Sequence, residues 1–309
     1  NRFALRYTLA DLLRDLQAQG LLALKNKTVA VVYGSDTLRE AQPTDIIAAM
    51  YDLAQLDEVE CRLLSNLSAL PAENIPYALL AFLLGEAEEA LEAPLSSLEN
   101  KGWIEYRKSD NSFKVSPVVQ EVTKSKNAGR LLDDCRTLVK VLLRGLHEDN
   151  RHTDNYQQAA VFARLGASVV QALPTDDDVA TLCQNIGDYH KDTGNLDGMM
   201  QAYQKMLDIQ TALCEAEPDH ADFKNGLAIS YSKLGDTHTS LGNLDHALTF
   251  YEEDLKLMRE LYEAYPQNVS FKNGLAISYS RLGNTHTSLG NLEMARRPFR
   301  PLVMPLSMT

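Results

Sequence analysis

A segment of 25 residues that occurs twice, 48 residues apart, constrains the fold more than any other feature of the sequence. FKNGLAISYSKLGDTHTSLGNLDHA begins at Phe223, FKNGLAISYSRLGNTHTSLGNLEMA begins at Phe271, and 21 of the 25 aligned residues are identical. A repeat of this kind is typical of solenoids, in which each unit buries its apolar face against its neighbours. Two nearly identical copies therefore predict equivalent packing contacts, and they argue against an active site in this half of the chain.

A third, degraded copy of the segment, CQNIGDYHKDTGNLDGMMQAYQKM, begins at Cys183. Two glycines and one histidine recur in the same register in all three copies. These residues are Gly187, Gly235 and Gly283, then Gly194, Gly242 and Gly290, and then His190, His238 and His286. We predict two long helices per repeat, in which Gly235 and Ala247 allow close approach and Tyr251 fills the space between the helices.

This pattern resembles the tetratricopeptide repeat, whose usual period is about 34 residues. The extra residues are expected to lengthen the helices, since the sequence keeps a helical pattern up to Pro266. The resemblance implies an α-solenoid whose first helices line a concave face that binds a peptide or protein. The alternative is that the polar residues of this face are only solvated. The residues expected on it are Gln184, Asp188, Lys191, Ser232, Asp236, Thr239, Ser280, Asn284 and Thr287.

The three histidines in register present a metal site as an alternative to packing. Two nitrogen ligands of one zinc ion lie roughly 3–4 Å apart, because each Zn–N bond is about 2 Å. Equivalent residues of stacked helices lie about 10 Å apart, which favours packing. His147 and His152 are five residues apart, not the four of a zinc-protease helix, and no two of the four cysteines form a CxxC. We therefore predict no metal, cofactor or catalytic site in this chain.

Residues 44–125 have the element order of a winged helix, with helices followed by a hairpin. Apolar spacing predicts helices within 43–56, 56–70, 75–84 and 86–102. The apolar face of the second comprises Leu56, Val59, Leu63, Leu64 and Leu67. Two alternating runs flank a polar turn at Ser109–Ser112, which predicts the hairpin. Upstream, the pattern predicts a helix from Thr8 to Gly20 and a short strand at 28–33.

Residues 44–125, followed by helices and repeats, resemble the region downstream of the nucleotide-binding domain in bacterial STAND or NB-ARC signalling NTPases. The resemblance implies that the chain is a sensor and regulatory region. FKVSPVVQEV, from Phe113, matches a motif in which the family commonly has a histidine that helps to hold ADP, and Ser116 occupies that position here. The chain has no GxxxxGK[ST] phosphate loop, so we do not expect this region alone to bind or hydrolyse ATP.

The formal net charge of −12 disfavours binding of the whole chain to nucleic acid or to an anionic membrane. A winged-helix transcription regulator with a repeat sensor remains one alternative, because the predicted wing region is basic. Its basic residues are Lys101, Arg107, Lys108, Lys114, Lys124, Lys126 and Arg130. However, the helix that would enter the major groove has no Lys or Arg, which disfavours DNA binding. Its acidic residues are Glu86, Glu88, Glu89, Glu92 and Glu99.

A stand-alone adaptor with the same architecture is the other alternative. No apolar run approaches the roughly 18 residues of a membrane span, so no membrane contact is expected. The scattered cysteines and the absence of a signal-peptide pattern predict a cytoplasmic location. The chain begins at Asn1 with NRFALRY, which is not typical of a domain start, and we expect it to be a fragment of a longer protein.

The sequence therefore predicts a mainly α-helical chain with one small β-wing. The predicted parts are 1–43, the helical remnant and linker of an upstream domain; 44–125, winged-helix-like; 126–176, a helical connector; 177–297, about three repeats, the last incomplete; and 298–309, an irregular tail. Pro298, Pro301 and Pro305 interrupt the helical pattern of the last repeat. The loss of its capping helix predicts self-association there.

Overall fold

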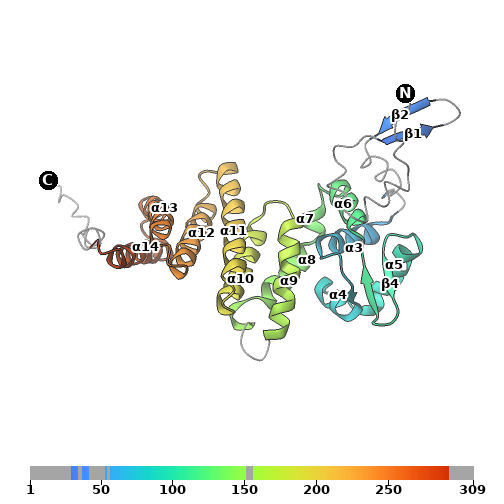
Figure 1. Ribbon diagram of the computed structural model, residues 1–309, viewed down its shortest axis with the longest axis horizontal. Helices are drawn as coiled ribbons and strands as arrows, with labels where there is room; N and C mark the ends of the chain where they lie inside the picture. The colour runs from blue at the N-terminus through green and yellow to red at the C-terminus, as the bar shows by residue number, and fades with distance from the viewer. Residues whose placement is uncertain (1–28, 34–36, 42–52, 54–55, 151–155, 292–309) are drawn as a thin grey trace, which may run out of the picture. The chain divides into compact units, whose positions relative to one another are not determined.

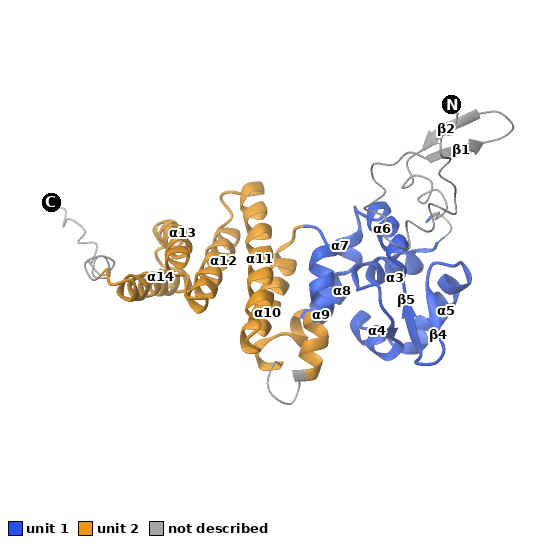
Figure 2. Ribbon diagram, viewed as in Figure 1, with its two compact units in different colours: residues 1–142, 164–174 blue, residues 143–163, 175–309 orange. Residues whose placement is uncertain are grey.

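The computed structural model describes residues 29–33, 37–41, 53, 56–150 and 156–291. The chain divides into two compact units, residues 1–142 with 164–174 and residues 143–163 with 175–309 (Figure 2). The division falls inside the predicted connector, and the domain boundaries given above remain predictions. The helices predicted from Thr8 and over 43–56 lie outside the described residues.

An antiparallel pair of strands, β1 (Val29–Tyr33) and β2 (Thr37–Ala41), comes first along the described chain, with Val29 opposite Ala41. The strand predicted at 28–33 is thus confirmed. Its partner was missed because TLREA lacks the apolar alternation that marks a strand.

The first unit contains short helices and a small three-stranded antiparallel sheet (Figure 1). Its first elements are α3 (Glu58–Ala69), β3 (Ile75–Pro76), α4 (Tyr77–Leu84), α5 (Glu88–Asn100), β4 (Glu105–Arg107) and β5 (Ser112–Lys114). The strands lie in the order β3-β5-β4, with Ile75 opposite Phe113. A capping box begins α3, since Asp57 accepts from the Glu60 amide at 2.8 Å and Glu60 accepts from the Asp57 amide at 2.8 Å.

These elements confirm the predicted helices and hairpin, with three corrections in detail. Ile75 and Pro76 pair with β5 rather than beginning α4, because proline supplies no N–H to an interior turn and serves as the N-cap. The hairpin turn ends at Asn111, with a φ of 47°, so Ser112 belongs to a strand. Val59 is 45% exposed and does not belong to the buried face of α3.

Four further helices follow the hairpin: α6 (Pro117–Lys126), α7 (Leu131–Asp134), α8 (Arg136–Gly145) and α9 (Tyr156–Ala172). The apolar stripe predicted through this region is interrupted at Cys135, which caps α7 and separates it from α8. The Ser116 hydroxyl, at the position that the resemblance relates to ADP, accepts from the Val119 amide at 3.3 Å and caps α6.

The second unit contains paired antiparallel helices in chain order (Figure 1). They are α10 (Asp177–Asp192), α11 (Leu196–Ala216), α12 (Ala221–Ser240), α13 (Leu244–Ala264) and α14 (Val269–Ser288). Gly194, Gly242 and Gly290 end the first helix of each repeat at a φ of 72°, 75° and 77°, the left-handed conformation that glycine accepts without strain. The predicted mainly helical solenoid with long helices is confirmed. Within the described part of the chain, no helix is long and apolar enough to cross a membrane.

Candidate functional site in the repeat unit

The two helices of each repeat approach closely where a glycine faces a tyrosine. A Cβ atom on Gly187 would lie 2.3 Å from Tyr203 Cε1, and one on Gly235 would lie 2.4 Å from Tyr251 Cε1. Both tyrosines and Ala247 are buried. No larger side chain fits at these glycines without displacing the ring, so the packing roles predicted for Gly235, Ala247 and Tyr251 are confirmed.

The tyrosine hydroxyls meet carboxylates that also join one repeat to the next. In the first such cluster, Asp188 of α10 accepts hydrogen bonds from the Tyr203 hydroxyl at 2.5 Å and from the Lys233 ammonium at 2.6 Å. Lys233 lies on α12, so this ion pair links the first helices of two successive repeats. Its side chains are only 16% and 23% exposed, which limits screening by solvent.

The same arrangement recurs one repeat further along. Asp236 of α12 accepts from the Tyr251 hydroxyl at 2.7 Å. The Arg281 guanidinium of α14 donates two N–H groups to the two oxygens of Asp236, each at 3.0 Å. This is the planar two-point geometry that arginine favours with a carboxylate. We name these two clusters the inter-repeat ladder.

A small cavity of about 140 Å³ lies beside the ladder, between the first helices α12 and α14 and the second helix α13. We call it the groove cavity. Its wall combines apolar side chains, both ladder cations and three polar groups. The lining residues are Ile229, Ser232, Lys233, Asp254, Met258, Gly274, Ile277, Ser278 and Arg281. Ile277 is 49% exposed, so an apolar side chain stands at the rim of this hollow.

Asp254 and Ser232 are two buried polar side chains that differ chemically in the groove cavity, a carboxyl and a hydroxyl. Asp254 is only 2% exposed, and burial raises the pKa of its carboxyl to about 6, although a hydrogen bond with Ser278 and the charge of Arg281 oppose the shift. The Ser232 hydroxyl is buried and has no hydrogen-bond partner among the described residues. The groove cavity thus holds an unpaired buried hydroxyl and a buried carboxyl in one hollow.

Replacing Asp254 with Asn is expected to stabilise the repeats at pH 7. The folded-state pKa of about 6 exceeds the ordinary value of 3.8, so the folded protein holds this proton more tightly. The stability that this proton contributes is present below pH 3.8 and is lost as pH rises to about 6. A shift of this size corresponds to about 2–3 kcal/mol, an upper figure for the gain in free energy of unfolding at pH 7.

Hydrogen exchange of α12–α14 between pH 4 and pH 7 measures this effect. The advantage of Asp254→Asn over wild type should shrink as pH falls toward 4. Glu252→Gln, an exposed change on the same helix, is the matched control and should show no such trend. A variant that is less stable than wild type at pH 7 would show that the Asp254 carboxylate stabilises the fold.

The nine residues predicted for a concave face occupy three kinds of environment. Asp188 and Asp236 belong to the inter-repeat ladder, and Ser232 lies buried in the groove cavity. Gln184 is half-buried. The exposed members are Lys191, Thr239, Ser280, Asn284 and Thr287. The structure brings Ser232 and the ladder residues close to one hollow, and binding of a partner by the nine residues remains a prediction.

Sequence reasoning missed the three residues that give the groove cavity its chemistry: Asp254, Ile277 and Arg281. One signal was available for Asp254. The residue one period (48 residues) earlier is Met206, which is buried. The register therefore predicts that the Asp254 side chain is also buried. Ile277 carried no signal, because an apolar residue on a helix does not reveal its own exposure.

The three histidines pack at the turn of each repeat. The His238 ring stacks on His246 and on Phe250, with centroids 5.3 Å apart in each case. Burial lowers the pKa of His190 and of His238, and the nearby His246 lowers that of His238 further. No cluster of three or more His, Cys, Asp or Glu side chains with metal-binding geometry occurs in the described ranges. His286 is buried, and His190 and His238 are half-buried.

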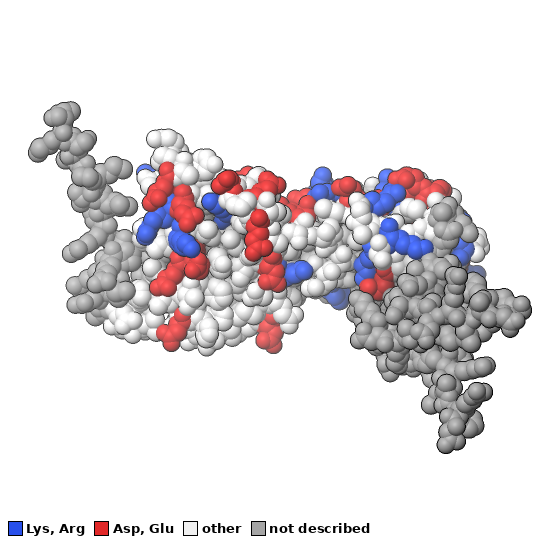
Figure 3. Space-filling view, turned by 90° about the horizontal axis from the view of Figure 1, so that it is seen from above, with Lys and Arg blue, Asp and Glu red and all other residues white. Residues whose placement is uncertain are grey.

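The basic residues around the hairpin are largely engaged in ion pairs. Lys101 donates to Glu60 at 2.7 Å, and Arg130 pairs with both Glu58 and Asp134. Arg107 pairs with Asp110 and Lys124 with Glu121. On the face shown in Figure 3, Lys and Arg side chains lie among Asp and Glu side chains, and no extended basic surface is visible. These pairings reduce the positive potential that phosphate binding requires.

Stacked helix pairs joined by a partly buried ladder define an α-solenoid. Models of the tetratricopeptide repeat match residues 180–212 and 227–264, so the chain contains tetratricopeptide repeats. Repeats of this class mediate protein–protein interaction.

Two solved structures show limited similarity to the chain. BtubC (BKLC) from P. vanneervenii has 16% sequence identity and a TM-score of 0.43, over 59% of this chain and 74% of that one. A Signal Transduction ATPase with Numerous Domains (STAND) protein with a tetratricopeptide repeat sensor, from Pyrococcus horikoshii, has 18% identity and a TM-score of 0.26. That match covers 93% of this chain and 55% of the STAND protein, so the chain spans about half its length. No curated protein matches the sequence. Neither structural likeness is close enough to carry an inference about function.

Proposed function

We propose that this chain is the protein-binding sensor and regulatory region of a STAND-type signalling NTPase. Its repeats bind a peptide or protein segment at the groove cavity, and residues 44–125 form a winged-helix-like regulatory part. The chain itself acts without catalysis and without a cofactor. Four free cysteines in the described part support a reducing, cytoplasmic location.

The groove cavity is the observation that carries the binding proposal. An extended peptide offers N–H donors and carbonyl acceptors, which match the Asp254 carboxyl and the unpaired Ser232 hydroxyl. Ile277 and Ile229 line the same hollow and offer apolar contact to one small partner side chain. Because Lys233 and Arg281 are paired within the ladder, charge recognition of an acidic partner is not the main attraction.

The regulatory part of the proposal is supported by element order rather than by similarity to a solved structure. The order α3, β3, α4, α5 and the β4–β5 hairpin is the helix–strand–helix–helix–hairpin order of a winged helix. It lies before the repeats, as in the family that the sequence resembles. Ser116 caps a helix here, so any contact of this residue with a nucleotide is a separate proposal.

A peptide array probed with the full chain tests the binding function. We expect wild type to retain a defined set of peptides, and Ile277→Arg at the cavity rim to lose that set. Val269→Arg is the matched control, because Val269 is 68% exposed, lies on the same helix and does not line the cavity. The charge change is therefore the same in both variants.

The pattern of the two variants decides the outcome. Equal loss of peptides in both variants would assign the effect to charge alone, and unchanged binding in Ile277→Arg would exclude the groove cavity as the site. Circular dichroism of each variant at the assay temperature confirms that both remain folded.

The signalling context is tested on the native gene product. Intact mass and peptide mapping upstream of Asn1 should reveal a longer chain with a phosphate loop. A product of about the 34.4 kDa of this chain would instead support the stand-alone adaptor. Strongly salt-dependent DNA binding by the full chain would support the transcription-regulator alternative, which the paired basic residues disfavour.

A further inference from the structure

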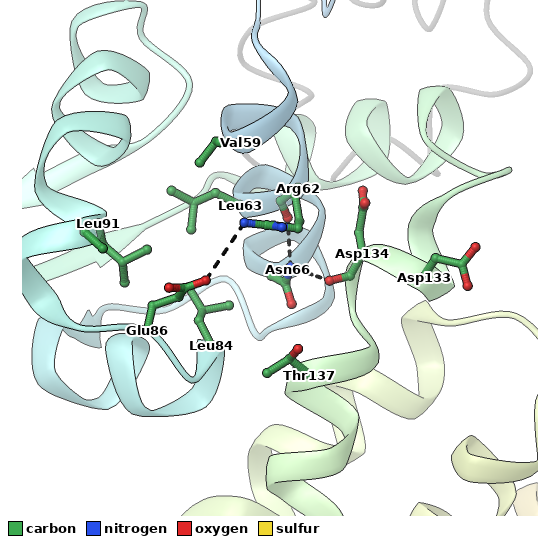
Figure 4. A pocket seen from close by; sticks show the side chains of 11 residues that line it. Val59, Arg62, Leu63, Asn66, Leu84, Glu86, Leu91, Asp133, Asp134 and Thr137 are labelled. Carbon is green, nitrogen blue, oxygen red and sulfur yellow. Dashed lines mark hydrogen bonds and ion pairs between the residues drawn. The ribbon is translucent and has the colours of Figure 1, made fainter.

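A second and larger cavity, of about 380 Å³, lies within the first unit and is unrelated to the repeats (Figure 4). Helix α3 contributes one wall, the end of α4 and the start of α5 contribute another, and α7 and α8 close a third side. The lining residues are Val59, Arg62, Leu63, Asn66, Leu84, Glu86, Ala90, Leu91, Asp133, Asp134 and Thr137. Its volume is within the range of small-molecule sites. We call it the α3 cavity.

Asn66 presents a buried acceptor to the α3 cavity. Its Nδ2 donates to the carbonyl oxygens of Arg62 at 2.8 Å and of Asp134 at 2.9 Å. Both partners are carbonyls and accept only, so exchanging the amide oxygen and nitrogen would destroy both bonds. The orientation is therefore fixed. Asn66 is 3% exposed, and its Oδ1 has no hydrogen-bond partner among the described residues. A buried acceptor of this kind requires a donor from a bound group or from water.

The charges around the cavity favour a cationic donor. Glu86, Asp133 and Asp134 contribute three carboxylates, against one guanidinium from Arg62. Arg62 and Glu86 lie 3.9 Å apart, the long limit of an ion pair, and both are about half exposed. Figure 4 shows this pair spanning the cavity beside Asn66. Arg130 pairs with Asp134 at 3.0 Å and Arg136 pairs with Asp133 at 3.7 Å. Glu86 has the longest of the three ion pairs, so it is the anion best placed to meet an incoming cation.

The rest of the wall is aliphatic. Leu63, Leu84 and Leu91 are buried and line the cavity, and the unexpectedly exposed Val59 adds to the same wall. A ligand that matches both the aliphatic wall and the polar wall of the cavity has a hydrocarbon stem and a charged head with several N–H donors. From these observations we propose that the α3 cavity binds an alkylammonium or alkylguanidinium group, with Asn66 Oδ1 as its buried acceptor and Glu86 as its counter-ion. The group is either a free amine or the side chain of a lysine or arginine.

Side-chain amide signals of the ¹⁵N-labelled full chain test the proposal directly. We expect agmatine and n-butylammonium to shift the Asn66 Nδ2 proton signals with saturation, whereas n-butanol, of similar shape but uncharged, does not. N-acetyl-lysine methylamide and N-acetyl-arginine methylamide form the second arm. Tighter binding of these amides than of agmatine would identify a protein side chain as the source, and the reverse would identify a free amine.

Variants that leave the two Asn66 hydrogen bonds intact provide the controls. Glu86→Gln should weaken agmatine binding about tenfold, which is the typical effect of losing one charged hydrogen-bond partner. Val59→Trp should block the cavity and abolish the shift. Glu88→Gln, an exposed change of the same type on α5 outside the cavity wall, should change affinity less than about twofold.

Two results would overturn the proposal. Equal binding of n-butanol and n-butylammonium would make the site a neutral one, and no saturable shift at about 10 mM agmatine would mean that water satisfies Asn66. Because the α3 cavity belongs to the first unit, neither result bears on peptide binding by the repeats.

Discussion

Gly235→Leu is expected to lower the free energy of unfolding of the repeats by about 3 kcal/mol, at the upper end of overpacking effects. The first added atom alone would lie 2.4 Å from the buried Tyr251 ring, well inside contact distance, and the remaining leucine atoms would reach further. The ring cannot rotate away freely, because its hydroxyl is held by Asp236 at 2.7 Å. The substitution therefore separates α12 from α13 or displaces the tyrosine from the ladder.

Hydrogen exchange of α12 and α13 measures this effect, with the fluorescence of Trp103 as an internal reference, since the single tryptophan is buried in the first unit. Gly129→Leu is the control for added bulk, because a Cβ atom there meets nothing within 4 Å. Tyr251→Ala should make Gly235→Leu much less harmful, since it removes the ring that the leucine meets. If the amide hydrogens of α12 and α13 exchanged at the wild-type rate in Gly235→Leu, the assigned packing of this helix pair would be wrong.

The repeat architecture was predictable because periodicity reports packing directly. Glycines 48 residues apart fix where helices end and where they approach, and the structure has both features in place at Gly235 and Gly242. Strand β3 was not predictable in the same way, since Ile75 and Pro76 continue smoothly into an apolar helix and only their pairing with β5 distinguishes them. The break at Cys135 likewise depends on the packing of α7 and α8.

The candidate site was only partly accessible to sequence reasoning. Asp188 and Asp236 were predicted to line a partner-binding face, which stays a prediction, and a pattern of single positions does not show that each carboxylate is paired with a cation. The cation that pairs with each carboxylate lies 45 residues later in the chain, which is the repeat period of 48 residues minus about one helical turn. Lys233 follows Asp188, and Arg281 follows Asp236, by this same spacing. A search for charge pairs at the period minus one turn would have found the ladder. The Asn66 Oδ1 is left without a partner because the Nδ2 of the same amide donates to two carbonyls, one of them 68 residues away in the sequence. No sequence pattern indicates such an arrangement.

The inter-repeat ladder is expected to couple the last two described repeats. Asp236→Ala removes the acceptor for both N–H groups of Arg281 and for the Tyr251 hydroxyl, and should lower the free energy of unfolding by about 2 kcal/mol. In a solenoid, stability is the sum of terms within repeats and terms between neighbours. The loss should therefore appear as faster hydrogen exchange throughout α14, even though the altered residue lies on α12.

A double-mutant cycle separates the ion pair from the tyrosine contact. Asp236→Asn retains an acceptor for the Tyr251 hydroxyl, so Asp236→Asn combined with Arg281→Gln isolates the charge pairing. We expect a coupling of about 1 kcal/mol, reduced by the roughly one-third exposure of both side chains. The matched cycle on Glu253 and Lys256, an exposed pair 3.8 Å apart on α13, should give a coupling near zero. Equal coupling in the two cycles would reduce the ladder to an ordinary surface pair, and α14 would then be held to α12 and α13 mainly by apolar packing.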